Sequence, residues 1–131
     1  MLGQFGAELL LLLRDVLLVA AGIDEWILTM KALAAIEAVT IVPGHGPVEH
    51  DKQYMLLVTE ALESLSQRAH AAVKQGLTQE QFQKSVDMAK FRTQIAGNDE
   101  TRVRNFDEYF VSPGAVRVYR EAKEGPLKDE N

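Results

Sequence analysis

The spacing of apolar residues changes near residue 50 of the chain. Before that point the apolar residues form short continuous runs, Leu9–Leu13 and Val16–Ala20, which Arg14 and Asp15 separate. Periodicity alone does not distinguish a buried strand from a buried helix in runs of this length. Val39–Val42 is β-branched throughout and is therefore the best strand candidate of the chain. After residue 50, apolar residues recur every three or four positions, which indicates helices.

Two helices are predicted around this change in pattern. The first runs from about Glu25 to Glu37, with Asp24 as its N-cap. Its apolar face comprises Trp26, Met30, Leu33 and either Ile36 or Glu37. The second is longer, from an N-cap at Asp51 to about Gln75, and Gly76 ends it. Its apolar face follows a seven-residue rhythm through Met55, Val58, Leu62, Leu65, Ala69 and Ala72.

Three shorter helices are predicted in the last third of the chain. The segment Thr78–Gln81 has the form of a capping box and opens a helix that reaches about Met88. A loop at 96–99 precedes a helix at Arg102–Phe110. Ser112 is the predicted N-cap and Pro113 the first position of a final helix that ends near Lys123. A polar tail follows from residue 124.

The balance of elements predicts an α/β fold in which a few N-terminal strands precede a mostly helical C-terminal region. A lone strand cannot satisfy its own backbone groups, and a two-stranded sheet is marginal in water. The strands therefore require neighbours that this sequence does not supply. We place a boundary between the two parts of the chain at residue 50.

Composition narrows the classes of function. The 131 residues carry a formal net charge of −5, and the 14 Lys and Arg are scattered among 19 Asp and Glu, so no basic face for nucleic acid is expected. The chain has no cysteine, which leaves His, Asp and Glu as the only side chains for a metal site. Arg14 and Asp15 interrupt the N-terminal apolar segment, and no basic region precedes it. We therefore expect a cytoplasmic protein without a membrane role.

The segment Pro43-Gly44-His45-Gly46-Pro47 is the strongest candidate for chemistry. The two glycines leave space on both sides of the imidazole, and the two prolines stiffen the loop. A histidine on a rigid loop after a strand suits metal ligation or proton transfer. A tight turn with a solvated histidine is the alternative interpretation.

The segment IVPGHGPVEH, which a Trp-containing helix precedes and a long helix follows, resembles the C-terminal part of the metallo-β-lactamase fold hydrolases. The closing segment FDEYFVSPGAVRVYREAK is similar to that of many members with this loop. The resemblance implies that His45 is a zinc ligand. It also implies that Asp15, in LLLLRDVLL, is an aspartate that bridges two metal ions, although Arg14 replaces the usual glycine. Residues 1–50 would then be the end of a metallo-β-lactamase-like α/β sandwich, and 51–131 a helical extension.

The main metal motif of that family, HxHxDH, is absent from this sequence, which has only His45, His50 and His70. Two matched ligands are fewer than the three or four that zinc requires. The chain is therefore expected to be inactive alone, as a fragment or as one part of a protein whose N-terminal segment is separate. Substrates of intact relatives would be esters, thioesters, lactams or phosphoesters, hydrolysed by a metal-bound hydroxide.

Other interpretations stay open. The chain could be a non-catalytic helical module that dimerises through its apolar N-terminal run and the long helix, or an enzyme whose site a second subunit completes. His50 could join Glu49 and Asp51 in an acidic metal cluster, or be a solvated residue at a helix start. His70 is expected on the surface or at the edge of the core. Asp24 and Glu25 could pair as acid and base, but acids are common at helix N-termini because of the helix dipole.

Overall fold

The computed structural model describes residues 22–37, 40–42 and 48–126 of the chain. Most of these residues are helical. The elements in chain order are α2 (Ile23–Ala35), α3 (Gln53–Lys74), α4 (Gln79–Ser85), α5 (Ala89–Ala96), α6 (Glu100–Phe106), the π-helical turn η1 (Asp107–Val111) and α7 (Ser112–Glu124). No helix in the described ranges is both long and apolar enough to cross a membrane.

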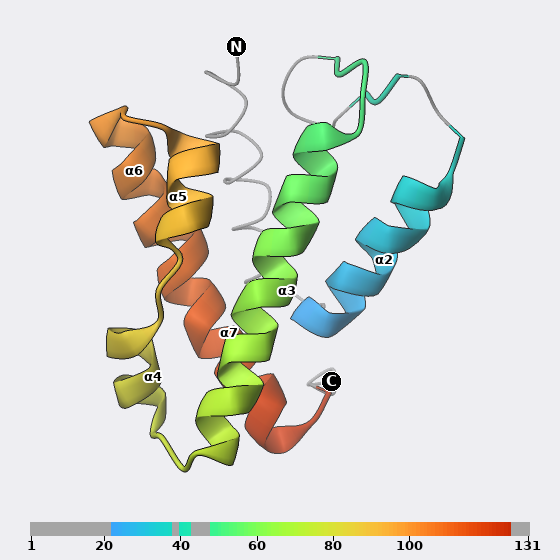
Figure 1. Ribbon diagram of the computed structural model, residues 1–131. Helices are drawn as coiled ribbons and strands as arrows, with labels where there is room; N and C mark the ends of the chain where they lie inside the picture. Colours follow the sequence, from blue (N-terminus) through green and yellow to red (C-terminus); the bar gives the residue numbers. More distant parts are fainter. Residues whose placement is uncertain (1–21, 38–39, 43–47, 127–131) are drawn as a thin grey trace, which may run out of the picture.

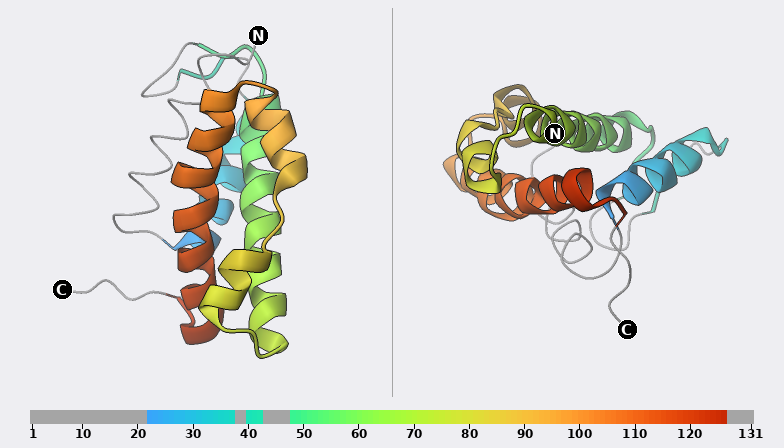
Figure 2. Two further views of the ribbon diagram at one scale, coloured as in Figure 1. Left: turned by 90° about the vertical axis from the view of Figure 1, so that its left-hand side faces the viewer. Right: turned by 90° about the horizontal axis from the view of Figure 1, so that it is seen from below.

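The long helix α3 is the centre of the fold (Figure 1). Helix α2 packs against one side of α3, and α7 packs against another side. The short helices α4 and α5 return the chain along α3, after which α6, η1 and α7 form one long rod (Figure 2). The apolar face predicted for α3 is confirmed, because Val58, Leu62, Leu65, Ala69 and Ala72 are all buried in the core. That face is therefore occupied within the chain.

Local sequence signals set the boundaries of α3 and α4. Gly76 adopts a φ of 76° just after α3, a left-handed conformation that favours glycine. The predicted capping box of α4 is confirmed: Thr78 Oγ1 accepts from the Gln81 N–H at 3.2 Å, and Gln81 Oε1 accepts from the Thr78 N–H at 2.8 Å. Helix α4 ends at Ser85, before the predicted Met88, and α5, which was not predicted, begins at Ala89.

The predicted N-cap at Ser112 is wrong, because the helix is continuous from Glu100 to Glu124. Ser112 has helical backbone angles, φ −62° and ψ −55°, and its N–H donates to the Asp107 carbonyl five residues back. Pro113 has no N–H, and its ring would clash with the carbonyl four residues earlier in a regular α-helix. The wider π turn of η1 directly before it accommodates the proline, so the rod does not break.

The predicted α/β fold with N-terminal strands is wrong for the part of the chain that the structure describes. The only β pairing there is an isolated antiparallel bridge between Ile41 and Glu49. Of the predicted strand Val39–Val42, residue 39 lies outside the described ranges, and Ile41 alone has a partner. A β-branched run forms a strand only where a neighbouring segment offers a continuous row of backbone groups. Here the chain turns into α3 at Gln53, which ends the pairing after one residue pair.

Two details of the first helix also differ from the prediction. Asp24 is not the N-cap, because α2 begins at Ile23, and Gly22 occupies the cap position without a side-chain hydrogen bond. The buried face comprises Ile23, Ile27 and Met30, whereas the predicted face residues Leu33 and Ile36 are 44% and 56% exposed. Apolar residues lie on several sides of α2, so their spacing did not determine which side faces the core.

Candidate functional site

The bridge between Ile41 and Glu49 brackets the segment that carries His45. The Ile41 N–H donates to the Glu49 carbonyl at 2.8 Å, and the Glu49 N–H donates to the Ile41 carbonyl at 2.9 Å. The two hydrogen bonds thus join the residues on either side of the segment 42–48, which we call the bracketed loop. His45, one of the two predicted metal ligands, lies within 43–47, outside the described residues, and the other, Asp15, lies outside them as well.

The bridge is anchored to the helices on both sides. The predicted N-cap at Asp51 is wrong by one residue, because Lys52 occupies the cap position of α3. Asp51 Oδ1 nevertheless accepts from the Gln53 N–H at 2.9 Å. The Lys52 Nζ donates to the carbonyls of Ala34, at 2.8 Å, and of Ile36. Because carbonyls at the end of a helix lack intrahelical partners, this ammonium group satisfies the C-terminus of α2. The base of the loop is thus fixed to α2 and to α3.

Acidic and phenolic groups lie beside the bridge. Partial burial, together with the nearby charge of Asp51, raises the pKa of Glu49. Burial and the charge of Glu49 raise the pKa of Tyr54 as well. The Tyr54 hydroxyl is buried and has no hydrogen-bond partner among the described residues. Next to the bridge, Glu49 and Tyr54 are therefore partly shielded from water, and each keeps its proton to a higher pH than it would in water.

The alternative metal cluster of Glu49, His50 and Asp51 does not assemble. His50 and Asp51 are exposed, and no group of three or more His, Cys, Asp or Glu side chains in the described ranges is arranged to hold a metal ion. The described residues therefore do not form a complete metal site by themselves. A site at His45 would need ligands from elsewhere, such as Asp15 or another polypeptide segment.

A second polar cluster joins α2 to α3, which sequence reasoning missed. Ser66 donates its hydroxyl hydrogen to Asp24 Oδ1 at 2.7 Å, and His70 Nε2 lies 3.8 Å from Asp24 Oδ2. The carboxylate stands between the serine and the histidine, so the serine–histidine hydrogen bond of a nucleophilic triad is absent from this cluster. Ser66 is also only 7% exposed. The cluster is a structural link between the two helices. The spacing of Ser66 and His70 on α3 was visible in the sequence, but the pairing with Asp24 was not.

A buried carboxylate on α7 replaces the missing N-cap of α2. Glu121, with a side chain only 4% exposed, accepts from the Ile23 N–H at 2.8 Å and from the Asp24 N–H at 3.3 Å. Burial raises the pKa of Glu121, against the lowering effect of these two hydrogen bonds and of Arg117. The Arg117 Nε lies 3.5 Å from Glu121 Oε1 as an ion pair without hydrogen-bond geometry. Gly22 leaves room for this contact, since a Cβ there would lie 3.3 Å from the Glu121 carboxyl carbon.

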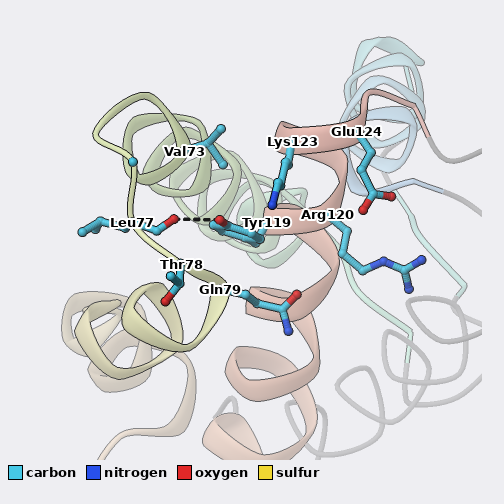
Figure 3. Close-up of a pocket in the computed structure, with 9 residues that line it drawn as sticks. Val73, Leu77, Thr78, Gln79, Tyr119, Arg120, Lys123 and Glu124 are labelled. Carbon is cyan, nitrogen blue, oxygen red and sulfur yellow. Dashed lines mark hydrogen bonds between the residues drawn. The ribbon is translucent and has the colours of Figure 1, made fainter.

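A cavity of about 390 Å³ lies at the other end of the bundle, between the end of α3, the start of α4 and the end of α7 (Figure 3). The Tyr119 hydroxyl donates to the Leu77 carbonyl at 2.7 Å and fixes its floor. Arg120, Lys123 and Glu124 line it with charges of both signs. The cavity is open to solvent and its charged side chains are exposed, which favours a weak, salt-sensitive contact over a specific site.

Comparison of the chain with protein-family models, with curated proteins and with solved structures finds no match.

Proposed function

We propose that this chain contributes His45 as a ligand to the metal site of a zinc-dependent hydrolase, and that other polypeptide segments complete this site. The observation that carries the proposal is the pair of backbone hydrogen bonds between Ile41 and Glu49, 2.8 and 2.9 Å long, on either side of the His45 segment. A metal ligand must be held in place before the ion binds, because each freely rotating ligand reduces affinity by its ordering entropy.

The anchoring of the bridge supports the same proposal. Lys52 ties the segment after the bridge to the end of α2, and Asp51 ties it to the start of α3. Both helices contribute side chains to one hydrophobic core. A loop with such a base is better suited to hold an imidazole in place than a turn on a free-standing hairpin, which is marginally stable in water. The proposal also rests on the resemblance of the PGHGPV segment to the zinc loop of metallo-β-lactamase fold hydrolases.

The chemistry available to such a site is hydrolysis of an ester, thioester, lactam or phosphoester. When bound, zinc lowers the pKa of a coordinated water and polarises the scissile group. The contribution of this chain is to hold the His45 loop by its base. Two predicted ligands, His45 and Asp15, are fewer than a zinc site needs, so we expect the chain alone to bind zinc weakly and to hydrolyse nothing.

Metal binding by the full chain tests the proposal. Equilibrium dialysis against Zn²⁺, with bound metal measured by mass spectrometry, should show less zinc bound to His45→Ala than to the unchanged protein. His70→Ala is the matched control, because His70 is an exposed imidazole on α3, outside the bracketed loop. Equal zinc binding by the unchanged chain and His45→Ala would contradict the proposal and favour the non-catalytic helical module.

A further inference from the structure

Helix α2 is the least buried of the three long helices and lies at the edge of the bundle (Figure 1). It buries three of its 13 residues, whereas α7, which has the same length, buries five. The three are Ile23, Ile27 and Met30, so no residue of α2 after Met30 is buried. Because few apolar side chains hold α2 to the other helices, its docking relies on polar contacts more than the docking of α3 or α7 does.

Charged side chains from other parts of the chain contact both ends of α2. At its N-terminus, Glu121 of α7 accepts from the Ile23 and Asp24 N–H groups at 2.8 and 3.3 Å. At its C-terminus, Lys52 donates to the Ala34 carbonyl at 2.8 Å. The two charges have the signs that the dipole of α2 favours at those ends. Glu121 is the buried member of the pair, with a side chain only 4% exposed, so it joins α2 to the core of the bundle.

The burial of Glu121 makes the docking of α2 sensitive to charge. A carboxylate loses its hydration when α2 covers it, and the two N–H groups compensate only in part, so the pKa of Glu121 is raised in spite of them. Asp24 of α2 opposes the ionisation of this carboxyl, and Arg117 of α7 favours it. From α3, His70 faces the same group through Asp24, whose Oδ2 lies 3.8 Å from the His70 Nε2. The docked position of α2 therefore accommodates the neutral Glu121 carboxyl better than the ionised one.

We propose that α2 is a detachable arm, which undocks from α3 and α7 while these two helices stay folded, and that ionisation of Glu121 favours the undocked position. Undocking exposes only three buried side chains of α2, and Leu65 of α3 contacts Gly114 of α7 without any contribution from α2. In the undocked position the Glu121 carboxylate is hydrated again. The protein therefore exposes the apolar side of α2, and the part of α3 that α2 covers, more often as the pH rises. The inference does not depend on zinc binding by His45.

Trp26 provides the first test, because it is the only tryptophan of the chain and lies on α2 with its indole nitrogen buried. Its fluorescence reports the docking of α2, whereas far-ultraviolet circular dichroism reports all helices together. In urea at neutral pH, the Trp26 transition of the unchanged protein should precede the circular dichroism transition, and this gap should narrow as the pH falls toward 4.5. Coincident transitions at neutral pH would overturn the proposal, because α2 would then unfold together with the rest of the bundle.

Variants of single side chains test the role of Glu121 in the same assay. Glu121→Gln keeps one acceptor and carries no charge, so its gap between the two transitions should not depend on pH. Glu121→Ala lacks both acceptors, so its gap should be wide at every pH. Glu124→Gln is the matched control, since Glu124 is an exposed carboxyl on the same helix, and it should behave like the unchanged protein. His70→Ala should keep the pH dependence. A pH-dependent gap in Glu121→Gln, or its loss in His70→Ala, would contradict the assignment to Glu121.

Hydrogen exchange provides a second measurement that needs no denaturant. The backbone amides of α2 should exchange at least about tenfold faster than those of α7 at neutral pH, after correction for intrinsic rates, because the arm opens without unfolding of the bundle. The comparison is matched, since both helices have 13 residues. In Glu121→Ala the difference between the two helices should persist. Equal protection of α2 and α7 in the unchanged protein would mean that α2 does not undock by itself, and the proposal would be wrong.

Discussion

Gly114 on α7 lies against Leu65 of α3, and its replacement by alanine tests that packing. A Cβ at this position would lie 2.8 Å from Cδ2 of Leu65, which is fully buried at 0% exposure. In a helix without this contact, Gly→Ala stabilises by about 0.5–1 kcal/mol through helix propensity. Extra volume in a packed core costs about 1–3 kcal/mol. The structure therefore predicts that Gly114→Ala destabilises the protein by about 1 kcal/mol, in spite of the higher helix propensity of alanine.

The measurement is urea unfolding followed by circular dichroism, with thermal unfolding as a second readout. A loss of about 1 kcal/mol lowers the midpoint temperature by roughly 4 °C in a chain of this size. Leu65→Ala alone should cost about 2–5 kcal/mol as a large-to-small core substitution. In the Leu65→Ala background, however, Gly114→Ala no longer meets Cδ2 and should stabilise by about 0.5–1 kcal/mol. The sign of the effect thus changes with the residue at position 65.

Two results would refute this reasoning. The first is a higher stability of Gly114→Ala than of the unchanged protein, which would mean that α7 and α3 are not in close contact at this position. The other is an equal effect of Gly114→Ala in both backgrounds, which would place the cost elsewhere, for instance in the helix next to Pro113. If Leu65→Ala does not fold, Leu65→Val provides the same comparison, because valine also lacks the Cδ atoms and removes less volume.

Four further predictions concern contacts at helix ends. Glu121→Ala should destabilise by about 2–3 kcal/mol, because two backbone N–H groups of α2 lose their acceptor. The pKa of Glu121 is raised in the folded state, so the folded protein binds this proton more tightly than the unfolded chain does. The free energy of unfolding of the unchanged protein, relative to that of Glu121→Gln, should therefore fall as the pH rises above about 4.5. An increase of this difference with pH would contradict the assignment. Thr78→Ala should cost about 1 kcal/mol by removing half of the capping box, measured by urea unfolding. Lys52→Met keeps the aliphatic stem but loses the donor at the end of α2, so it should cost up to about 1 kcal/mol and speed hydrogen exchange in the last turn of α2 more than in α4.

The sequence predicted well wherever the determining contacts are local. The capping box at Thr78 depends on Gln81, three residues away, and the buried face of α3 depends on spacings of three and four. Such contacts form within a single helical turn, so their pattern is visible in the letters alone. The start of α3 next to Asp51 and its end at Gly76 belong to the same class.

The sequence misled where the outcome depends on a partner outside the element itself or on an uncommon backbone geometry. The run around Ile41 has strand propensity, but only a partner segment makes a strand, and the partner here is the single residue Glu49. Ser112 before Pro113 is a common helix start, yet the π turn lets one helix continue through both. Asp24 looks like an N-cap, but the cap of α2 is Glu121, 97 residues further along the chain than Asp24.

For the candidate site, the sequence alone singled out His45 and Asp15, which lie outside the described residues, so their predicted roles stay predictions. What the tertiary structure decided is the setting of that segment: the bridge between Ile41 and Glu49, and the anchors to α2 and α3. The physical reason is that hydrogen bonds and caps within one helical turn are encoded by neighbouring residues. When a helix has apolar residues on several sides, by contrast, the packing of the other helices decides which side is buried.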